Sequence, residues 1–195
     1  MDIINKHDII LNDNNKIILK PLMDKHFPLL YKWENDSEVL YWSEGDKIEQ
    51  WDEESTRSLF GDISKNAKCF LIEIDSIPIG YSWLQKMNIK EIIAENKDKD
   101  VRRIDISIGE KNYWNKGYGT KIIEMLLEYA FEKENVDYVY GIVYDYNKRS
   151  CRVFEKNGFE INKVKKLPEG MKGKNELHYL ITKEKYHIIV RTHCT

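Results

Sequence analysis

Apolar residues follow two spacings along the chain, and each change of spacing predicts a change of element. Alternating or unbroken apolar runs predict strands at 17–22, 69–75, 77–84, 103–108, 138–144, 159–164 and 177–182. Apolar residues three or four apart predict helices from residue 24 onward and over 53–63, 120–133 and 149–157. The polar stretch 91–100 is expected to be a loop, and 187–195 shows no assignable pattern.

Three local signals support this order. A tight turn at Asp75-Ser76 would join two consecutive strands, and Gly158 stands where a left-handed cap would end a helix. Within 120–133 one apolar stripe runs along the helix: Ile122, Ile123, Leu126, Leu127, Ala130 and Phe131. The predicted class is a single α/β (α+β) domain, with a long antiparallel run first and one helical crossover later.

Composition excludes several classes of protein. At 195 residues and 42% apolar content, the chain fits one domain with a real core. A net charge of −2 gives no support to a nucleic-acid or membrane-surface binder, and no apolar run reaches transmembrane length. The N-terminus lacks the apolar region of a signal peptide. Cys69, Cys151 and Cys194 form no CxxC pair, and the histidines lack ligand spacing. We therefore expect a cytoplasmic protein with reduced thiols and no metal site.

The most informative motif is Gly117-Tyr118-Gly119, between the strand at 103–108 and the strongest helix. A glycine-rich turn entering a helix offers unpaired backbone N–H groups and the positive end of the helix dipole to a phosphate. Ile122 stands where a dinucleotide fingerprint needs its third glycine, and no Gly-Lys-[Ser/Thr] of a P-loop occurs. By itself the turn fits either a phosphate site or a helix entry without a ligand.

A second block decides between these alternatives. The segment 147–159, with its Asn147 and its Glu-Lys-Asn-Gly-Phe ending, together with 113–120, resembles the GNAT superfamily of acetyl-CoA-dependent N-acetyltransferases over residues 101–160. Further motifs resemble the aminoglycoside 6'-N-acetyltransferases: Asp105, Ile108-Gly109-Glu110, Asn112-Tyr113-Trp114, Glu38-Val39-Leu40 and Ile77-Pro78-Ile79-Gly80-Tyr81.

This resemblance implies a GNAT fold across 1–195, with a mixed, mostly antiparallel sheet that splays after Asp105. A cofactor-binding core would span about 101–160 and an acceptor-binding lobe about 20–85. Acetyl-CoA would be the co-substrate, with its pyrophosphate on the backbone amides of 115–120 and Asn147 near its pantetheine or cysteamine end. The residues expected to hold it are Ile106, Ile108, Trp114, Asn115, Lys116, Gly117, Tyr118, Gly119, Thr120 and Asn147.

In the resembled family the acid at the position of Asp105 is proposed to take the proton from the attacking amine. A carboxylate suits this step because it can bind an ammonium and accept its proton. The alternative is that Asp105 is a surface acid near the end of a strand and has no catalytic role. Many GNAT enzymes have Tyr where this chain has Phe154, which cannot donate a proton, so no general acid is assigned.

The acceptor is suggested by charge. Nine acids and one base lie between Glu34 and Glu54, interleaved with aromatic residues, and this segment suits either a polycationic substrate or a solvated surface. The expected acceptor is the 6'-amine of an aminoglycoside, bound to a monomer or homodimer. A polyamine or protein N-terminal amine is an alternative, as is a non-catalytic acyl-CoA-binding domain. The acceptor-binding residues expected are Trp42, Glu44, Asp46, Asp105 and Asp145.

Overall fold

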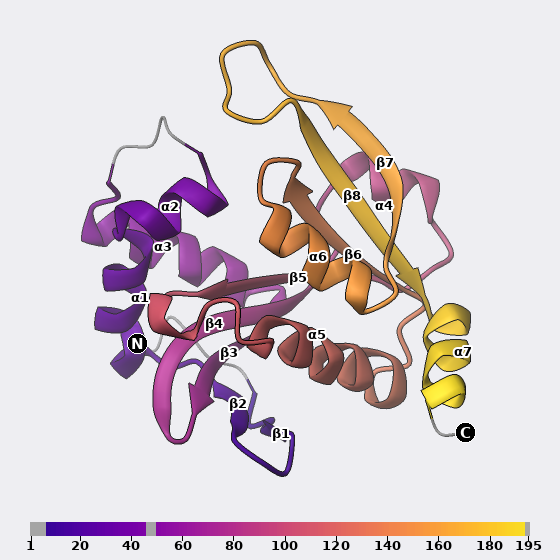
Figure 1. Ribbon diagram of the computed structural model, residues 1–195, viewed down its shortest axis with the longest axis horizontal. Coiled ribbons are helices and arrows are strands. Elements are labelled where there is room, and N and C mark those ends of the chain that lie inside the picture. The colour runs from indigo at the N-terminus through magenta and orange to yellow at the C-terminus, as the bar shows by residue number, and fades with distance from the viewer. Residues whose placement is uncertain (1–6, 46–49, 194–195) are drawn as a thin grey trace.

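The computed structural model describes residues 7–45 and 50–193. Within them the strands form one eight-stranded sheet, in the order β1-β2-β3-β4-β5-β6-β8-β7 (Figure 1). The strands are β1 (Leu11–Asn12), β2 (Ile17–Pro21), β3 (Ala67–Ile74), β4 (Ile77–Lys86), β5 (Val101–Ile108), β6 (Tyr138–Tyr144), β7 (Glu160–Lys166) and β8 (Asn175–Thr182). The α-helices are α1 (Phe27–Glu34), α2 (Ser37–Ser43), α3 (Glu53–Ser64), α4 (Lys90–Glu95), α5 (Tyr118–Glu128), α6 (Lys148–Lys156) and α7 (Lys183–His193). The short turns are η1 (Asp24–His26), η2 (Lys111–Tyr113) and the π-helical η3 (Tyr129–Lys133).

The first five strands run antiparallel in chain order, as the sequence predicts. Asp75 and Ser76 form the predicted tight turn between β3 and β4, with φ angles of 50° and 66°. Gly158 has the predicted left-handed conformation, with φ of 82°, after α6. Gly80 allows β4 and β5 to approach closely, because a Cβ there would lie 2.1 Å from the Ser107 carbonyl oxygen.

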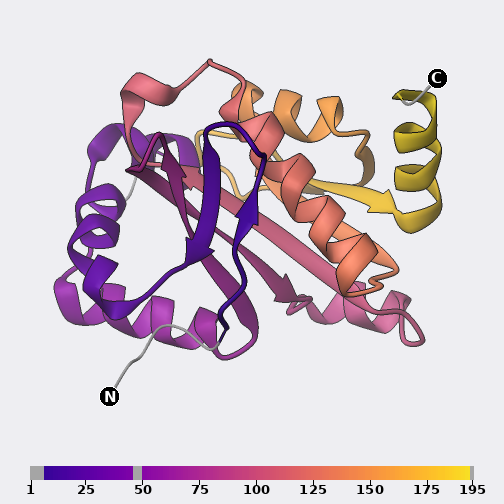
Figure 2. The same ribbon diagram turned by 90° about the horizontal axis from the view of Figure 1, so that it is seen from below.

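A helical crossover through α5 makes β6 parallel to β5, and here the sheet opens. The two strands pair only from Val101 to Arg103, opposite Tyr138 to Tyr140, although β5 continues to Ile108 and β6 to Tyr144. The predicted splay is therefore present, and it begins at Ile104, one residue before Asp105, instead of after it. Figure 2 shows α5 crossing one face of the sheet.

Strand alternation separates two cores on opposite faces of the sheet. In β3, Phe70 and Ile72 belong to the large core that contains Ile104 and the α5 stripe, whereas Leu71 belongs to a second core. That second core packs Leu30 and Trp33 of α1 and Phe60 of α3 against β3 and β4. By the same alternation, Ile104, Ile106 and Ile108 lie on the α5 face of β5, and Arg103, Asp105 and Ser107 on the α1–α3 face.

One sequence prediction was wrong, and one segment that carried no prediction forms a helix. The segment 91–100, expected to be a loop, begins with α4, whose Ile92 is buried in a small cluster with Met87, Val101 and Tyr140. The unassigned C-terminal segment largely belongs to α7, anchored by Tyr186, whose ring lies 4.9 Å from that of Phe131. None of the described helices is both long and apolar enough to cross a membrane.

Candidate active site

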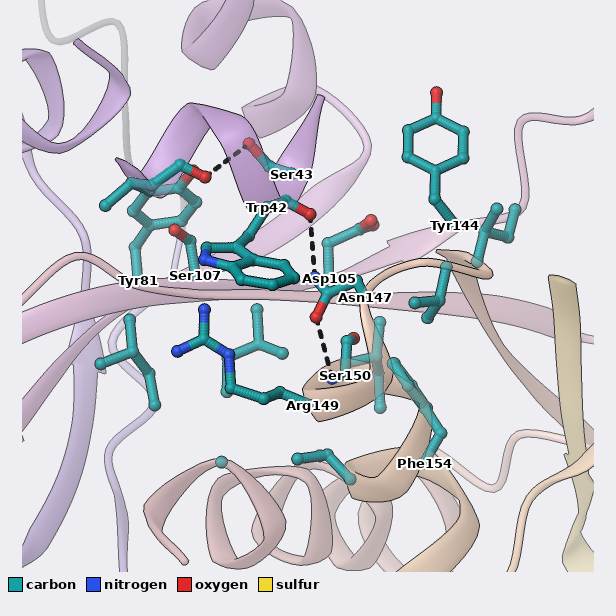
Figure 3. Close-up of a pocket in the computed structure, with 18 of the residues that line it drawn as sticks. Trp42, Ser43, Tyr81, Asp105, Ser107, Tyr144, Asn147, Arg149, Ser150 and Phe154 are labelled. Atoms are coloured by element: carbon teal, nitrogen blue, oxygen red, sulfur yellow. Dashed lines mark hydrogen bonds between the residues drawn. The ribbon is translucent and has the colours of Figure 1, made fainter. Parts of the chain in front are cut away.

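A cleft of about 830 Å³ lies where β5 and β6 part. Its walls come from α2, β4, β5, the start of α5 and the start of α6, so residues from both faces of the splayed sheet meet there (Figure 3). This position joins the predicted acceptor-binding lobe to the predicted cofactor-binding core.

Asp105 lies in this cleft, with its side chain 20% exposed. It stands opposite Trp83 in the β4–β5 register, and Trp83 Nε1 donates to Asp105 Oδ2 at 2.7 Å. Arg103, two residues earlier on the same face of β5, donates from Nη2 to Asp105 Oδ1 at 2.6 Å. The carboxylate is therefore oriented by one bond at each oxygen. Each oxygen keeps a lone pair for a further donor.

Glu34, at the end of α1, places a second carboxylate in the cleft. Its Oε1 accepts a hydrogen bond from the hydroxyl of Tyr81, a buried residue of β4. Burial raises the pKa of the Glu34 carboxyl, against the opposing effect of this hydrogen bond. Burial also holds the pKa of Tyr81 well above its ordinary value, so the tyrosine remains the donor.

The acidic segment divides into cleft residues and surface residues. Glu44 lines the cleft with Glu34, and its side chain is exposed. Partial desolvation raises the pKa of the Glu44 carboxyl. The charge of Arg103 lowers this pKa, and the charge of Asp105 raises it. By contrast, Asp36 and Asp52 cap α2 and α3. Glu53 pairs with Arg57 at 2.9 Å on the surface of α3. The predicted acceptor residue Asp46 lies outside the described residues.

The start of α5 has the geometry expected of a phosphate site. Gly117 is its N-cap residue in the left-handed conformation, with φ of 84°, and no side chain caps the helix. A Cβ at Gly117 would meet nothing within 4 Å, so the space beside the turn is open. The first-turn N–H groups and the helix dipole thus face an accessible volume. The predicted cofactor residues that line the cleft are Ile106, Ile108, Trp114, Asn115, Gly117, Tyr118, Gly119, Thr120 and Asn147.

Lys116 is the predicted cofactor residue whose side chain points elsewhere. Its ammonium lies 5.7 Å from the centroid of the Tyr113 ring, and the residue is exposed and not part of the cleft lining. Its role in cofactor binding stays a prediction.

Arg149 of α6 lies between two tryptophans. Its guanidinium carbon is 4.5 Å from the Trp42 ring centroid and 4.0 Å from that of Trp114. Trp114 is itself fixed by a 2.6 Å hydrogen bond from Nε1 to the Ile108 carbonyl oxygen. Burial lowers the pKa of Arg149. The stack links the acceptor side, through Trp42, to the loop before α5.

Asn147 and Asp145 follow β6, and both side chains make bonds within the chain. Asn147 Oδ1 accepts from Ser150 N at 3.1 Å as the cap of α6, and its Nδ2 donates to the Trp42 carbonyl oxygen at 2.9 Å. Asp145 accepts from Lys174 N at 3.1 Å and from Asn175 Nδ2 at 2.9 Å, and it is not among the residues that line the cleft. Its role in acceptor binding stays a prediction.

Phe154 lines the cleft and belongs to the core, with its ring 5.8 Å from that of Tyr179. The Tyr144 hydroxyl also lies in the cleft region, and Figure 3 shows it pointing away from Phe154. Cys69 and Cys151 are buried, and burial raises the pKa of both thiols, to about 12 for Cys69. Within the part of the chain that is described, no group of three or more potential metal ligands gathers.

This architecture matches known proteins. Residues 16–160 match the family model for the acetyltransferase (GNAT) domain, which is well over half of the chain. The chain belongs to the GNAT acetyltransferase family. The GNAT fold and the acetyltransferase assignment predicted from the motifs are thereby confirmed.

The chain is also similar to individual acetyltransferases. An aminoglycoside N(6')-acetyltransferase type 1 of Klebsiella pneumoniae is 26% identical over 179 residues, covering 86% of this chain and 85% of its own. The solved structure of AAC(6')-Ib in complex with ribostamycin and coenzyme A has a TM-score of 0.74 at 20% identity, over 89% of this chain and 97% of its own. A spermidine N-acetyltransferase from Vibrio cholerae, solved with CoA and spermine, has a TM-score of 0.71 at 16% identity, over 88% of this chain and 98% of its own.

Trp83 and several contacts of this GNAT cleft were missed by sequence reasoning. Trp83 could have been found, because alternation along β4 places it on the same face as Tyr81 and the hairpin register then sets it against a β5 residue. Two contacts join segments far apart in the chain: the Glu34–Tyr81 hydrogen bond and the packing of Arg149 between Trp42 and Trp114. No local sequence pattern predicts either of them.

Proposed function

We propose that the chain transfers the acetyl group of acetyl-CoA to a primary amine of a polycationic small molecule, namely the 6'-amine of an aminoglycoside. The observation that carries this proposal is the shared cleft, in which the Asp105 carboxylate and the uncapped start of α5 lie together. The relative from Klebsiella pneumoniae, which matches over 86% of this chain, supports the choice of acceptor.

The residues present fit acetyl-CoA. The turn 115–120 offers backbone N–H groups, an open space at Gly117 and the positive end of the α5 dipole to a pyrophosphate. Beyond Arg103, β5 remains paired with β4 but no longer with β6, and its free edge between Ile104 and Ile108 offers backbone groups to a pantetheine chain and a thioester carbonyl. Acetyl-CoA supplies an activated acetyl group as its thioester.

Asp105 binds the acceptor ammonium and takes its proton in this proposal. The hydrogen bonds from Trp83 and Arg103 hold the carboxylate in place, so its free lone pairs face the cleft in one orientation. The neutral amine then attacks the thioester carbonyl carbon directly. The new C–N bond forms, the C–S bond breaks, and the nitrogen releases its second proton to solvent as the amide forms. The leaving thiolate is protonated by solvent, because Phe154 has no proton to give. The buried, high-pKa thiols of Cys69 and Cys151 offer no nucleophile for an acyl-enzyme.

A polyamine is the second candidate acceptor. Four carboxylates line the cleft, those of Glu34, Glu44, Asp105 and Glu176, together with four cations, Arg103, Arg149, Arg152 and Lys156. Several carboxylates in one cleft suit a molecule that carries several ammonium groups. The structural likeness to a spermidine N-acetyltransferase is in keeping with this candidate.

A panel of acceptors tests the proposal. Purified protein is incubated with acetyl-CoA and either kanamycin, ribostamycin, spermidine or a short peptide with a free N-terminus, and thiol release is recorded. Turnover of kanamycin, with NMR of the product showing acetylation at the 6'-nitrogen, is expected. Turnover of spermidine alone would favour the polyamine reading. Binding of acetyl-CoA without turnover of any amine would overturn the catalytic assignment.

A further inference from the structure

A lysine ammonium lies inside a cage of aromatic rings beside the cleft. Lys172, in the loop between β7 and β8, places Nζ 2.7 Å from the centroid of the Tyr41 ring, 4.5 Å from that of Tyr146 and 4.9 Å from that of Trp42. Tyr41 and Trp42 belong to α2, and Figure 1 shows the β7–β8 loop reaching toward that helix. We call these three rings the ammonium cage.

Within the described residues, the ammonium is held by these rings. Lys172 Nζ is buried there without a hydrogen-bond partner, and no carboxylate of the described residues lies within ion-pair distance of it. A buried ammonium without hydrogen bonds loses hydration, and the negative faces of aromatic rings offset part of that loss. The cage is therefore a binding site for an ammonium group. The ring contacts stabilise the lysine ammonium less than a carboxylate partner would.

One wall of the cage also belongs to the cleft. The Trp42 ring contacts Lys172 in the cage and Arg149 in the cleft, and Trp42 lines the cleft together with Asp105. A molecule with several amines that places one of them at Asp105 thus lies next to a second site built for the same chemical group.

We propose that the ammonium cage is a subsite for a second amine of the acceptor, and that Lys172 is a resident cation which this amine displaces. The inference rests on the proposed function for its acceptor class. Exchange of one ammonium for another conserves the ring contacts, and the displaced lysine regains its hydration in solvent. Acceptors with one amine gain nothing from the cage, so the site selects for polycations.

Kinetics with Lys172→Ala test the proposal. Removing the competing cation should lower KM for spermidine and kanamycin about tenfold, with kcat and the KM for a monoamine such as benzylamine unchanged. Lys174→Met, in the same loop with an exposed side chain, is the matched control and should change neither. Tyr41→Leu should raise the KM for the polycations alone. A rise in KM for all acceptors with Lys172→Ala would show that Lys172 has a structural role and would overturn the proposed subsite. An unchanged KM for the polycations would also overturn it.

A binding measurement separates this inference from the proposed function. Tetramethylammonium is titrated into each protein without acetyl-CoA and followed by NMR of the aromatic side chains. Lys172→Ala should bind it more tightly than the unmodified protein, and the double variant Tyr41→Leu/Lys172→Ala should lose that gain. If no amine is acetylated but this pattern holds, the proposed function fails and the cage stands. If kanamycin is acetylated but the pattern is absent, the cage fails alone.

Discussion

Asn147 Nδ2 donates a 2.9 Å hydrogen bond to the carbonyl oxygen of Trp42, a residue 105 positions earlier in the chain. The same side chain caps α6 through its Oδ1. One amide thus fixes the start of α6 and ties it to the end of α2 across the cleft. The two sides of the cleft keep their spacing through this bond and the neighbouring Arg149 stack.

Asn147→Ala should lower the free energy of unfolding by about 1–2 kcal/mol, because it removes a helix cap and a second hydrogen bond. Asn147→Asp keeps the acceptor for Ser150 N but has no donor for Trp42, so it should recover most of that stability. Both variants should raise the KM for the acceptor, since the Trp42 wall loses its tie. Urea unfolding and initial rates measure these effects. Equal destabilisation by both variants would contradict the assignment of stability to the cap.

Asp105→Asn should lower kcat/KM for the amine about 10²- to 10⁴-fold, because an amide cannot take the ammonium proton. Affinity for acetyl-CoA, measured by calorimetry, should stay within about twofold, since the donor groups of the α5 turn are untouched. Asp62→Asn is a matched control, because Asp62 pairs with Lys65 on the exposed face of α3. Undiminished acetylation by Asp105→Asn would remove Asp105 from the mechanism.

Glu34 predicts a pH dependence of stability. Burial raises the pKa of its carboxyl in the folded protein, so above the ordinary value near 4.5 the native state holds more protons than the unfolded chain. The free energy of unfolding therefore falls as pH rises through that window. Glu34→Gln keeps an acceptor for the Tyr81 hydroxyl and abolishes this contribution. Its stability relative to the unmodified protein should be greater at pH 8 than at pH 4.

Thermal unfolding between pH 4 and pH 8 checks this difference. Glu53→Gln serves as the control, since Glu53 lies on the exposed face of α3, paired with Arg57. A parallel shift at every pH for Glu34→Gln would show that the effect comes from packing and not from ionisation.

Substitution of the two glycines of the turn before α5 by alanine should change the stability of the protein differently. Gly117→Ala places a side chain at φ of 84°, a left-handed conformation that costs about 1 kcal/mol, although nothing lies within 4 Å of the new Cβ. Gly119→Ala has ordinary backbone geometry in the helix, with its Cβ 3.4 Å from Val153, and should be neutral or slightly stabilising. Melting curves compare the two, and only Gly117→Ala should displace the turn amides and raise the KM for acetyl-CoA through the backbone.

The sequence predicted those parts of the fold that local patterns encode. The α5 stripe, the Asp75-Ser76 turn and the strand that carries Asp105 are each visible in a short window of sequence. The helix α4 was missed because its single buried residue, Ile92, gives no helical period. From the sequence, the acidic segment fitted either a polycation-binding surface or a solvated one. Its charge is in fact divided, since capping and surface pairing depend on helix boundaries that composition does not reveal.

Within the candidate site, the predicted cofactor turn lines the cleft, whereas the contacts that hold Asp105 and Trp42 came only from the structure. Trp83 and Arg103 act on Asp105 through strand register and alternation, which a sequence fixes only when the pairing is known. The ring contacts of Lys172 join a loop to a helix more than a hundred residues away. Such contacts are set by tertiary packing.

The alternation of side chains along β5 has an evolutionary consequence. Arg103, Asp105 and Ser107 lie on one face of β5, which the proposed function assigns to the acceptor, whereas Ile106 and Ile108 lie on the other face, which it assigns to acetyl-CoA. Point substitutions can therefore retune one substrate while leaving the other unaffected. A single residue inserted into this strand would move every following side chain to the opposite face of the sheet. We expect descendants of this chain to diversify their acceptors by substitution, with the length of β5 unchanged.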